Sequence, residues 1–359
     1  FTGGTKPMSA GAVIAASLIG AQLVYVGGSD YLEKHRRPEP GSERAFFAPD
    51  PLAASGEIDL QLAESLYRRH DYGGAAAILN SLAGRMHNPR PYEALAALAE
   101  GYRAWEQLDL ETAISKLSRA EMTTASLSPE FCFGPCNCLS RCSHLLRSQI
   151  DNLEALKSKM PGKGVALSLL KDELCAKALI ISLYESALRA EVRTDYSSGS
   201  LLLYRLMELL SQRRLAVYGI DTAQPDYSAL ASRELTADDL LVRFNKVKSS
   251  VRRSLKQTTY RVADDGGLPN PIDLTGGYML LEALDDGFCL PAAKVAWPRF
   301  MSEIRARNHG IFAHGFRPVS KAQHDSHLKT LDRLIECFCV VDGINLADAK
   351  AEFTFINPW

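Results

Sequence analysis

Apolar side chains recur at intervals of three and four residues along most of the chain, from Ile58 to the C-terminal region. This spacing places them on one face of a helix, so each such segment is expected to bury that face against a neighbour. The predicted fold class is therefore mainly α, and a short α/β segment at the N-terminus is the exception.

Two stretches of the helical pattern form a repeat. The turns at Asp71-Tyr72 and Asp109-Leu110 each separate two apolar runs, and they lie 38 residues apart. That interval is near the helix-turn-helix period of tetratricopeptide-like repeats. Because two repeats alone do not bury a continuous core, we expect this pair to pack on a neighbouring domain.

A second helical block is predicted from about residue 165 to the end. Ser198-Gly199-Ser200 is a candidate N-cap for one of its helices, and Gly219 is a candidate end. Pro298 is placed to open the helix that carries the strongest chemical motif. The helix between these two is marked by four apolar positions: Phe244, Val247, Val251 and Leu255.

The first residues follow a different pattern. A glycine-rich loop leads into a predicted helix from Pro7 to Ile19, and a predicted strand runs from Leu23 to Val26. Residues 33–57 are rich in proline, glycine and charge, and we interpret them as a linker. Since a glycine-rich loop that enters a helix normally follows a strand, this α/β segment is expected to be shortened. The three predicted domains are the partial α/β segment with its linker, a tetratricopeptide-like helical domain and a C-terminal helical domain, over residues 1–50, 51–160 and 161–359.

The composition narrows the class of protein. The formal net charge is −1, so any nucleic-acid contact must come from a local patch rather than from a general positive field. The eight cysteines lack the spacing of a secreted disulfide scaffold, which favours reduced thiols and a cytoplasmic location. The uncharged stretch from Ala10 to Val26 contains glycines and falls short of the roughly 20 apolar residues of a membrane helix, so no membrane contact is expected.

The strongest chemical motif is Arg307-Asn308, followed by His314-Gly315. Seven residues are two helical turns less about 20°, so Arg307 and His314 are predicted to project from nearly the same line of one helix. They continue an apolar stripe that includes Phe300 and Ile304. A permanently charged Arg on such a stripe needs an ion-pair partner, a substrate anion or another subunit.

This motif resembles the signature of HEPN ribonucleases, in which an Arg and a polar residue precede a His by four to six intervening positions. The resemblance implies a helical HEPN-like domain in which two copies of the motif meet across a homodimer interface. It also implies cleavage of single-stranded RNA without a metal or other cofactor. Arg307, Asn308 and His314 are then the catalytic residues.

The residue types suit that reaction. A 2′-hydroxyl attacks the adjacent phosphate, His314 moves protons near neutral pH, and Arg307 stabilises the additional charge on the phosphorane. Asn308 would orient either group by hydrogen bonding. The expected products carry a 2′,3′-cyclic phosphate and a 5′-hydroxyl.

The alternative interpretation of the motif is structural. Arg307 would then form a buried ion pair, and His314 would face the dipole at a helix end. On this interpretation the chain is a non-catalytic helical scaffold with an inactive HEPN fold that serves dimerisation. A third possibility is a stand-alone, toxin-like HEPN ribonuclease.

A second motif lies in the N-terminal loop Thr2-Gly3-Gly4-Thr5-Lys6. Successive glycines before a helix expose backbone N–H groups, and Lys6 with the threonine hydroxyls would complete a phosphate cradle. This loop resembles that of CARF domains, which sense cyclic oligoadenylate in type III CRISPR defence. CARF and HEPN domains occur together in CRISPR-associated ancillary ribonucleases, so the resemblance implies cyclic oligoadenylate as an activator. The alternative is a glycine turn that feeds a packed helix.

Two further clusters are candidates for binding. Cys132, Cys136, Cys138 and Cys142 are closely spaced, but their spacing matches no common zinc motif, and a thiol-rich loop is the simpler interpretation. A basic run beside apolar helix positions could follow an RNA backbone, although such a run is more often a solvated helix face. Its three candidates are Arg252, Arg253 and Lys256.

Overall fold

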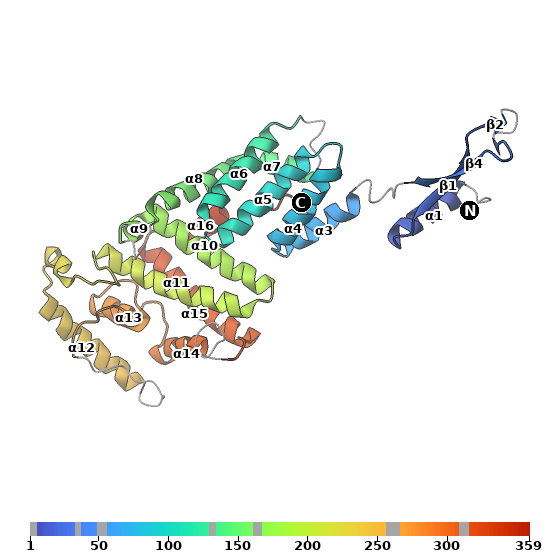
Figure 1. The fold of residues 1–359 in the computed structure, drawn as a ribbon. Helices are drawn as coiled ribbons and strands as arrows, with labels where there is room; N and C mark the ends of the chain where they lie inside the picture. The colour runs from blue at the N-terminus through green and yellow to red at the C-terminus, as the bar shows by residue number, and fades with distance from the viewer. Residues whose placement is uncertain are drawn as a thin grey trace.

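The computed structural model describes residues 6–32, 37–48, 56–128, 134–160, 167–255, 266–308 and 316–359, and it is mainly α-helical (Figure 1). The N-terminal unit consists of α1 (Lys6–Leu18), β1 (Leu23–Gly28), β2 (Tyr31–Leu32), β3 (Arg37–Pro38) and β4 (Glu43–Ala48). The predicted helix and the predicted first strand are confirmed.

Residues 43–48 form the strand β4, so the interpretation of residues 33–57 as a linker is wrong for this part. This strand pairs with β1 in an antiparallel register, with Tyr25 opposite Phe46. The strands β2 and β3 between them are also antiparallel, and Gly41, whose φ of 91° lies in the left-handed region that favours glycine, connects β3 to β4. Residues 37–48 of this segment therefore belong to a hairpin.

The described part of the first helical block contains α3 (Glu57–Arg68), α4 (Tyr72–Arg85), α5 (Arg90–Glu106), α6 (Leu110–Ala125), α7 (Gly134–Arg141) and α8 (Ser143–Lys159). Both predicted repeat turns are present. Asp71 caps α4 and Asp109 caps α6, each accepting a hydrogen bond from a backbone N–H three residues later. The residues before them, His70 and Leu108, have positive φ angles of 60° and 55°.

The second block contains α9 (Leu167–Lys171), α10 (Glu173–Val192), α11 (Tyr196–Val217), η2 (Tyr227–Arg233), α12 (Ala237–Ser254), α13 (Leu274–Ala283), α14 (Trp297–Asn308), α15 (Lys321–Val341) and α16 (Leu346–Phe353). The long helices α10 and α11 lie side by side, and α15 packs on α11 (Figure 1). Gly219, with φ of 83°, follows α11 as predicted.

The predicted cap of α11 is wrong. Asp195, not the Ser198-Gly199-Ser200 segment, caps this helix, and its side chain accepts a hydrogen bond from the Ser198 backbone N–H at 3.1 Å. Thr194 before it has a φ of 60°. The α10–α11 turn therefore uses the same pattern as the two repeat turns: a residue with positive φ followed by a capping Asp.

One hydrophobic core runs through both helical blocks, which confirms that the repeat pair packs on a neighbouring domain. Trp105 of α5 donates a hydrogen bond to Ser182 of α10 at 3.0 Å. The C-terminal segment returns to the first block, where the rings of Phe355 and Tyr102 stack with centroids 4.0 Å apart. Among the helices that the structure describes, none combines the length and the apolar character needed to cross a membrane.

Candidate active site

Helix α14 carries the start of the predicted motif. Arg307 and Asn308 are its last two residues, so the helix reaches the first half of the motif. Residues 309–315, with His314, lie outside the described part of the chain, as does the side chain of Arg307. The shared helical face of Arg307 and His314 therefore stays a prediction.

The apolar stripe that leads to Arg307 is present. Phe300 is fully buried, and its ring contacts those of Tyr278 and Trp297 at centroid distances of 4.8 and 5.9 Å. Ile304, one turn further, is also buried. Since Arg307 follows Ile304 by three residues, the helical period places its Cα on the side of α14 that faces the core.

A buried polar cluster holds α14 on α15. Glu303 is only 4% exposed, and its carboxylate lies 3.0 Å from Nε2 of His327, 2.6 Å from Nε of Arg299 and 2.8 Å from the donating hydroxyl of Ser326. Burial opposes the ionisation of Glu303, but the contacts from His327 and Ser326 outweigh it and lower the pKa of this carboxyl. Glu303 is thus an anion that its neighbours neutralise, four residues before Arg307.

The start of α15 is fixed on the other side of the motif. Ser320 and Gln323 form a capping box, in which each side chain bonds the backbone N–H of the other residue. His324 is fully buried, and its Nδ1 lies 3.4 Å from the hydroxyl of Ser200 on α11. Gly199 allows this close approach, because a Cβ there would lie 2.7 Å from the His324 ring. Burial lowers the pKa of His324, which keeps the ring neutral.

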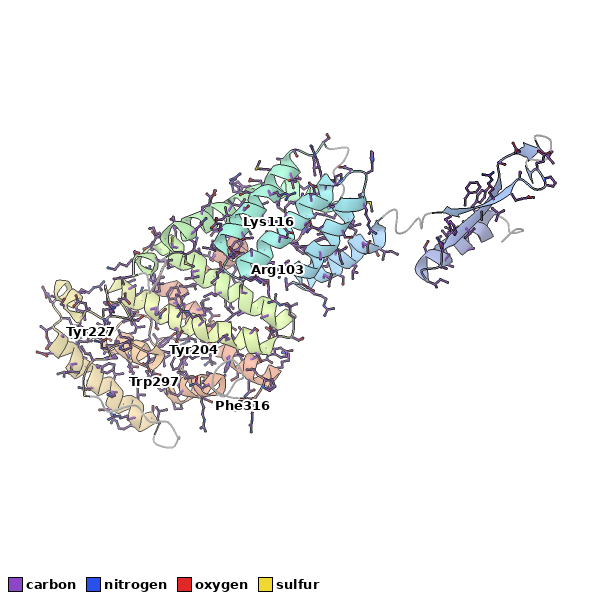
Figure 2. The ribbon with its side chains drawn as sticks, viewed as in Figure 1. Arg103, Lys116, Tyr204, Tyr227, Trp297 and Phe316 are labelled. Atoms are coloured by element: carbon purple, nitrogen blue, oxygen red, sulfur yellow. The ribbon has the colours of Figure 1, made fainter. Side chains whose placement is uncertain are left out.

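A pocket of about 230 Å³ lies between these two anchored ends. It is lined by Arg305 and Ala306 of α14, and by Arg317 and Val319 of the segment that precedes α15. Phe316, next to it in the sequence, has a side chain that is 93% exposed and projects from the surface (Figure 2). Guanidinium groups bind phosphates in bidentate geometry, and an exposed aromatic ring offers a stacking surface to a base. The surroundings of the motif thus have the chemistry of a nucleic-acid site.

Both helical blocks match models of known protein domains. Residues 171–338 match a family model described as the Csm6 HEPN domain, and residues 56–133 match one described as the Csm6 6H domain. The chain is 32% identical over 323 residues to the CRISPR system endoribonuclease Csm6 of Thermus thermophilus, across 88% of the chain. The chain belongs to the CRISPR-associated ancillary ribonuclease family. It spans 63% of the length of that curated relative.

The matches agree with the fold of this family member. The HEPN model covers α10 to α14 and most of α15, so it includes the motif from Arg307 to His314. The 6H model covers α3 to α6, which are the helices of the predicted repeat pair. The block predicted to be tetratricopeptide-like is therefore the 6H region of the family.

The other candidate residues are placed as follows. Thr2, Gly3, Gly4 and Thr5 lie outside the described residues, and Lys6 is the first residue of α1. In the basic run, Arg253 is exposed on α12, Arg252 is half-buried, and Lys256 lies outside the described residues. Neither the cyclic oligoadenylate site nor the RNA role of this run is tested by these positions.

Within the described residues, the cysteine cluster keeps one close pair, since burial and an interaction with the Cys138 thiol raise the pKa of the Cys142 thiol. The Cys136 thiol donates to the backbone oxygen of Pro91 at 3.5 Å, and the Cys138 thiol donates to that of Asn357 at 3.7 Å. Cys132 lies outside the described residues. Within the described ranges, no three His, Cys, Asp or Glu side chains are grouped as metal ligands.

Sequence reasoning missed His324, His327 and Glu303. Both histidines are buried where α15 meets a neighbouring helix. A signal was available: His324 and His327 are three residues apart and, with Leu331 and Leu334, follow the spacing of one helix face. Their partners are on other helices, which sequence spacing alone does not identify.

Proposed function

We propose that the chain is a metal-independent endoribonuclease that cuts single-stranded RNA in CRISPR-type antiviral defence. The match of residues 171–338 to the Csm6 HEPN domain carries this proposal, because the matched segment includes Arg307, Asn308 and His314. The relative from Thermus thermophilus, which is named an endoribonuclease, supports the same reaction class. The anchored ends of the motif and the arginines of the adjacent pocket fit a polyanionic substrate.

In the proposed reaction, the 2′-oxygen of a ribose forms a bond to the adjacent phosphorus while the bond from phosphorus to the 5′-oxygen breaks. The 2′-hydroxyl proton leaves to a base, and a proton reaches the departing 5′-oxygen. His314 moves these protons, and Arg307 stabilises the charge that develops on the phosphorane. Asn308 orients one of the two by hydrogen bonding. The products carry a 2′,3′-cyclic phosphate and a 5′-hydroxyl.

Regulation and assembly belong to the same proposal. Two chains associate so that two Arg307–His314 pairs face one RNA strand, and cyclic oligoadenylate at the Thr2 to Lys6 loop shifts the dimer toward that arrangement. The resemblance of the loop to CARF domains supports the choice of activator. Cleavage rates with and without cyclic oligoadenylate, for the wild type and for Lys6→Ala, test this part separately.

The experiment incubates end-labelled single-stranded RNA with the protein in excess chelator. Wild type, His314→Ala and the matched control His87→Ala are compared, because His87 is exposed and lies outside the motif. We expect cleavage by the wild type and by His87→Ala, and a loss of about 100-fold or more in His314→Ala. Equal behaviour of all three proteins would instead favour a non-catalytic scaffold, and cleavage that the chelator abolishes would contradict the metal-independent chemistry.

A further inference from the structure

A larger pocket, of about 670 Å³, lies far from the motif in sequence. Three arginines from three different elements line it: Arg69 from the turn between α3 and α4, Arg103 from α5, and Arg193 at the C-cap of α10. Arg103 lies on the first helical block close to the second (Figure 2). The pocket is therefore built at the seam between the 6H and HEPN regions.

Both carboxylates that line this pocket already have partners within the protein. Glu106 contacts Nε of Arg189 at 2.8 Å and Nη1 of Arg193 at 3.1 Å. Asp71 accepts the capping hydrogen bond from Gly74 at 2.9 Å. Across the part of the chain that the structure describes, the side chains of Arg69 and Arg103 have no carboxylate partner. Two exposed guanidinium groups thus line the pocket without an ion-pair partner, and three arginines line it against two carboxylates.

The wall of the pocket is rigid. Arg193 donates to the backbone oxygen of His70 at 3.3 Å, and Nδ1 of His70 lies 2.9 Å from the hydroxyl of the buried Tyr72. Burial is the main cause that lowers the pKa of His70, so the ring is neutral and adds no charge of its own near neutral pH. A fixed wall with two guanidinium groups that have no ion-pair partner favours an anion that accepts several hydrogen bonds, and a phosphate group has this property.

The position of the pocket relative to the motif indicates which molecule supplies the phosphate. The backbone N–H of Val319, which lines the pocket beside the motif, donates to the hydroxyl of Ser197 at 3.2 Å. Ser197 follows Arg193 by four residues, a length of chain that spans at most about 14 Å. The α10–α11 turn therefore contributes to the arginine pocket at one end and contacts the motif's flank at the other. A single strand of several nucleotides is long enough to bind at both places.

We infer that the arginine pocket binds a backbone phosphate of the single-stranded RNA, several nucleotides away from the bond that is cut. The identity of the strand rests on the proposed function, whereas the binding of a phosphodiester rests on the pocket alone. Arg69 and Arg103 contact the phosphate, and Arg193 completes the wall while it neutralises Glu106. This site extends substrate binding from the HEPN region to the 6H region.

The test measures binding without cleavage. The probe is a uniformly 2′-O-methylated single-stranded RNA of about 12 nucleotides, which lacks the attacking hydroxyl and suits the site sizes of strand-binding proteins. Its affinity is measured over a range of salt concentrations for the wild type and for Arg69→Gln/Arg103→Gln. The matched control is Arg119→Gln/Arg141→Gln, which removes two exposed arginines of the first block that do not line the pocket. Arg69→Lys/Arg103→Lys keeps the charge and serves as a second comparison.

Loss of two phosphate contacts reduces the magnitude of the slope of log affinity against log salt by about 1.4, so the loss of affinity relative to the wild type is roughly 25-fold larger at about 0.1 M salt than at 1 M. We expect this in Arg69→Gln/Arg103→Gln, with slopes near the wild-type value in the other two variants. An unchanged slope in the pocket variant, or an equal loss in the control, overturns the inference. The inference is also overturned if Arg69→Gln/Arg103→Gln binds adenosine monophosphate more weakly than the wild type does but binds the RNA probe with unchanged affinity. Because the probe is not cut, failure of the nuclease proposal shows only in the cleavage assay.

Discussion

The Nε2 atom of His327 lies 3.0 Å from a carboxylate oxygen of Glu303, and both side chains are buried where α15 crosses α14. Glu303 precedes Arg307 by one helical turn. The contact therefore fixes the end of α14 that enters the motif. The position of Arg307 therefore depends on His327, which follows Glu303 by 24 residues in the sequence.

Glu303→Gln tests this dependence. The amide keeps the size of the side chain but removes the charge that Arg299, Ser326 and His327 surround. We expect the free energy of unfolding to fall by about 1–3 kcal/mol and RNA cleavage to slow by up to roughly 100-fold. Denaturant titration and initial rates measure the two effects. Glu208→Gln is the control, because Glu208 pairs with Arg205 on the surface and such pairs contribute about 0–1 kcal/mol. Equal effects of the two substitutions would contradict the positioning role.

His324 predicts a dependence of stability on pH. Burial lowers the pKa of this ring in the folded state, so the unfolded chain binds the proton more readily. Stability is then fully present above the unfolded pKa of about 6.5 and falls as pH decreases below it, by at most about 1.4 kcal/mol per pH unit. Denaturant midpoints between about pH 7.5 and 5 should show a smaller slope in His324→Gln than in the wild type. The same slope in both proteins would contradict a neutral, buried His324.

Phe316 is predicted to contact RNA rather than to stabilise the fold. Its side chain is 93% exposed, so Phe316→Ala should change the free energy of unfolding by less than about 0.5 kcal/mol. Loss of one stacked base should weaken the binding of 2′-O-methylated RNA by about 1–3 kcal/mol, measured by fluorescence anisotropy. The control is Val340→Ala on α15, which removes another exposed apolar side chain, 82% accessible. RNA affinity that is unaffected by Phe316→Ala would exclude the stacking role.

Phe355 is predicted to stabilise the fold rather than to contact RNA. It is buried, stacks on Tyr102 and receives the guanidinium of Arg189 at 3.8 Å from its ring centroid. Phe355→Ala is expected to lower the free energy of unfolding by about 3–5 kcal/mol, because a large aromatic side chain leaves a cavity between the two helical blocks. Thermal and chemical unfolding measure this effect. A loss below about 1 kcal/mol would mean that the C-terminal segment is not part of the core.

The sequence predicted the features that depend on local chemistry. Asp71 and Asp109 marked two helix starts, and the apolar spacing of Phe300 and Ile304 gave the buried face of α14. The third turn of the same kind, at Asp195, was missed because the serines that follow it are also good N-cap residues. Local preference alone does not decide between neighbouring candidates for a cap.

Features that depend on long-range pairing were not predicted. The strand β4 pairs with β1, and its two phenylalanines favour a strand, but the proline, glycine and charge around it made the longer segment resemble a linker. The Glu303–His327 contact and the arginine pocket each join segments that are distant in the sequence. Tertiary contacts supply this information, and helical periodicity specifies which face is buried but not which helix covers it.

The most direct measurement uses a 2′-O-methylated RNA with one unmodified ribose, incubated in excess chelator. The account predicts a single cut by the wild type on the 3′ side of that ribose, with a 2′,3′-cyclic phosphate on one product and a 5′-hydroxyl on the other, and no cut by His314→Ala. A cut at other positions, products with a 3′-hydroxyl and a 5′-phosphate, or equal cleavage by His314→Ala would contradict it.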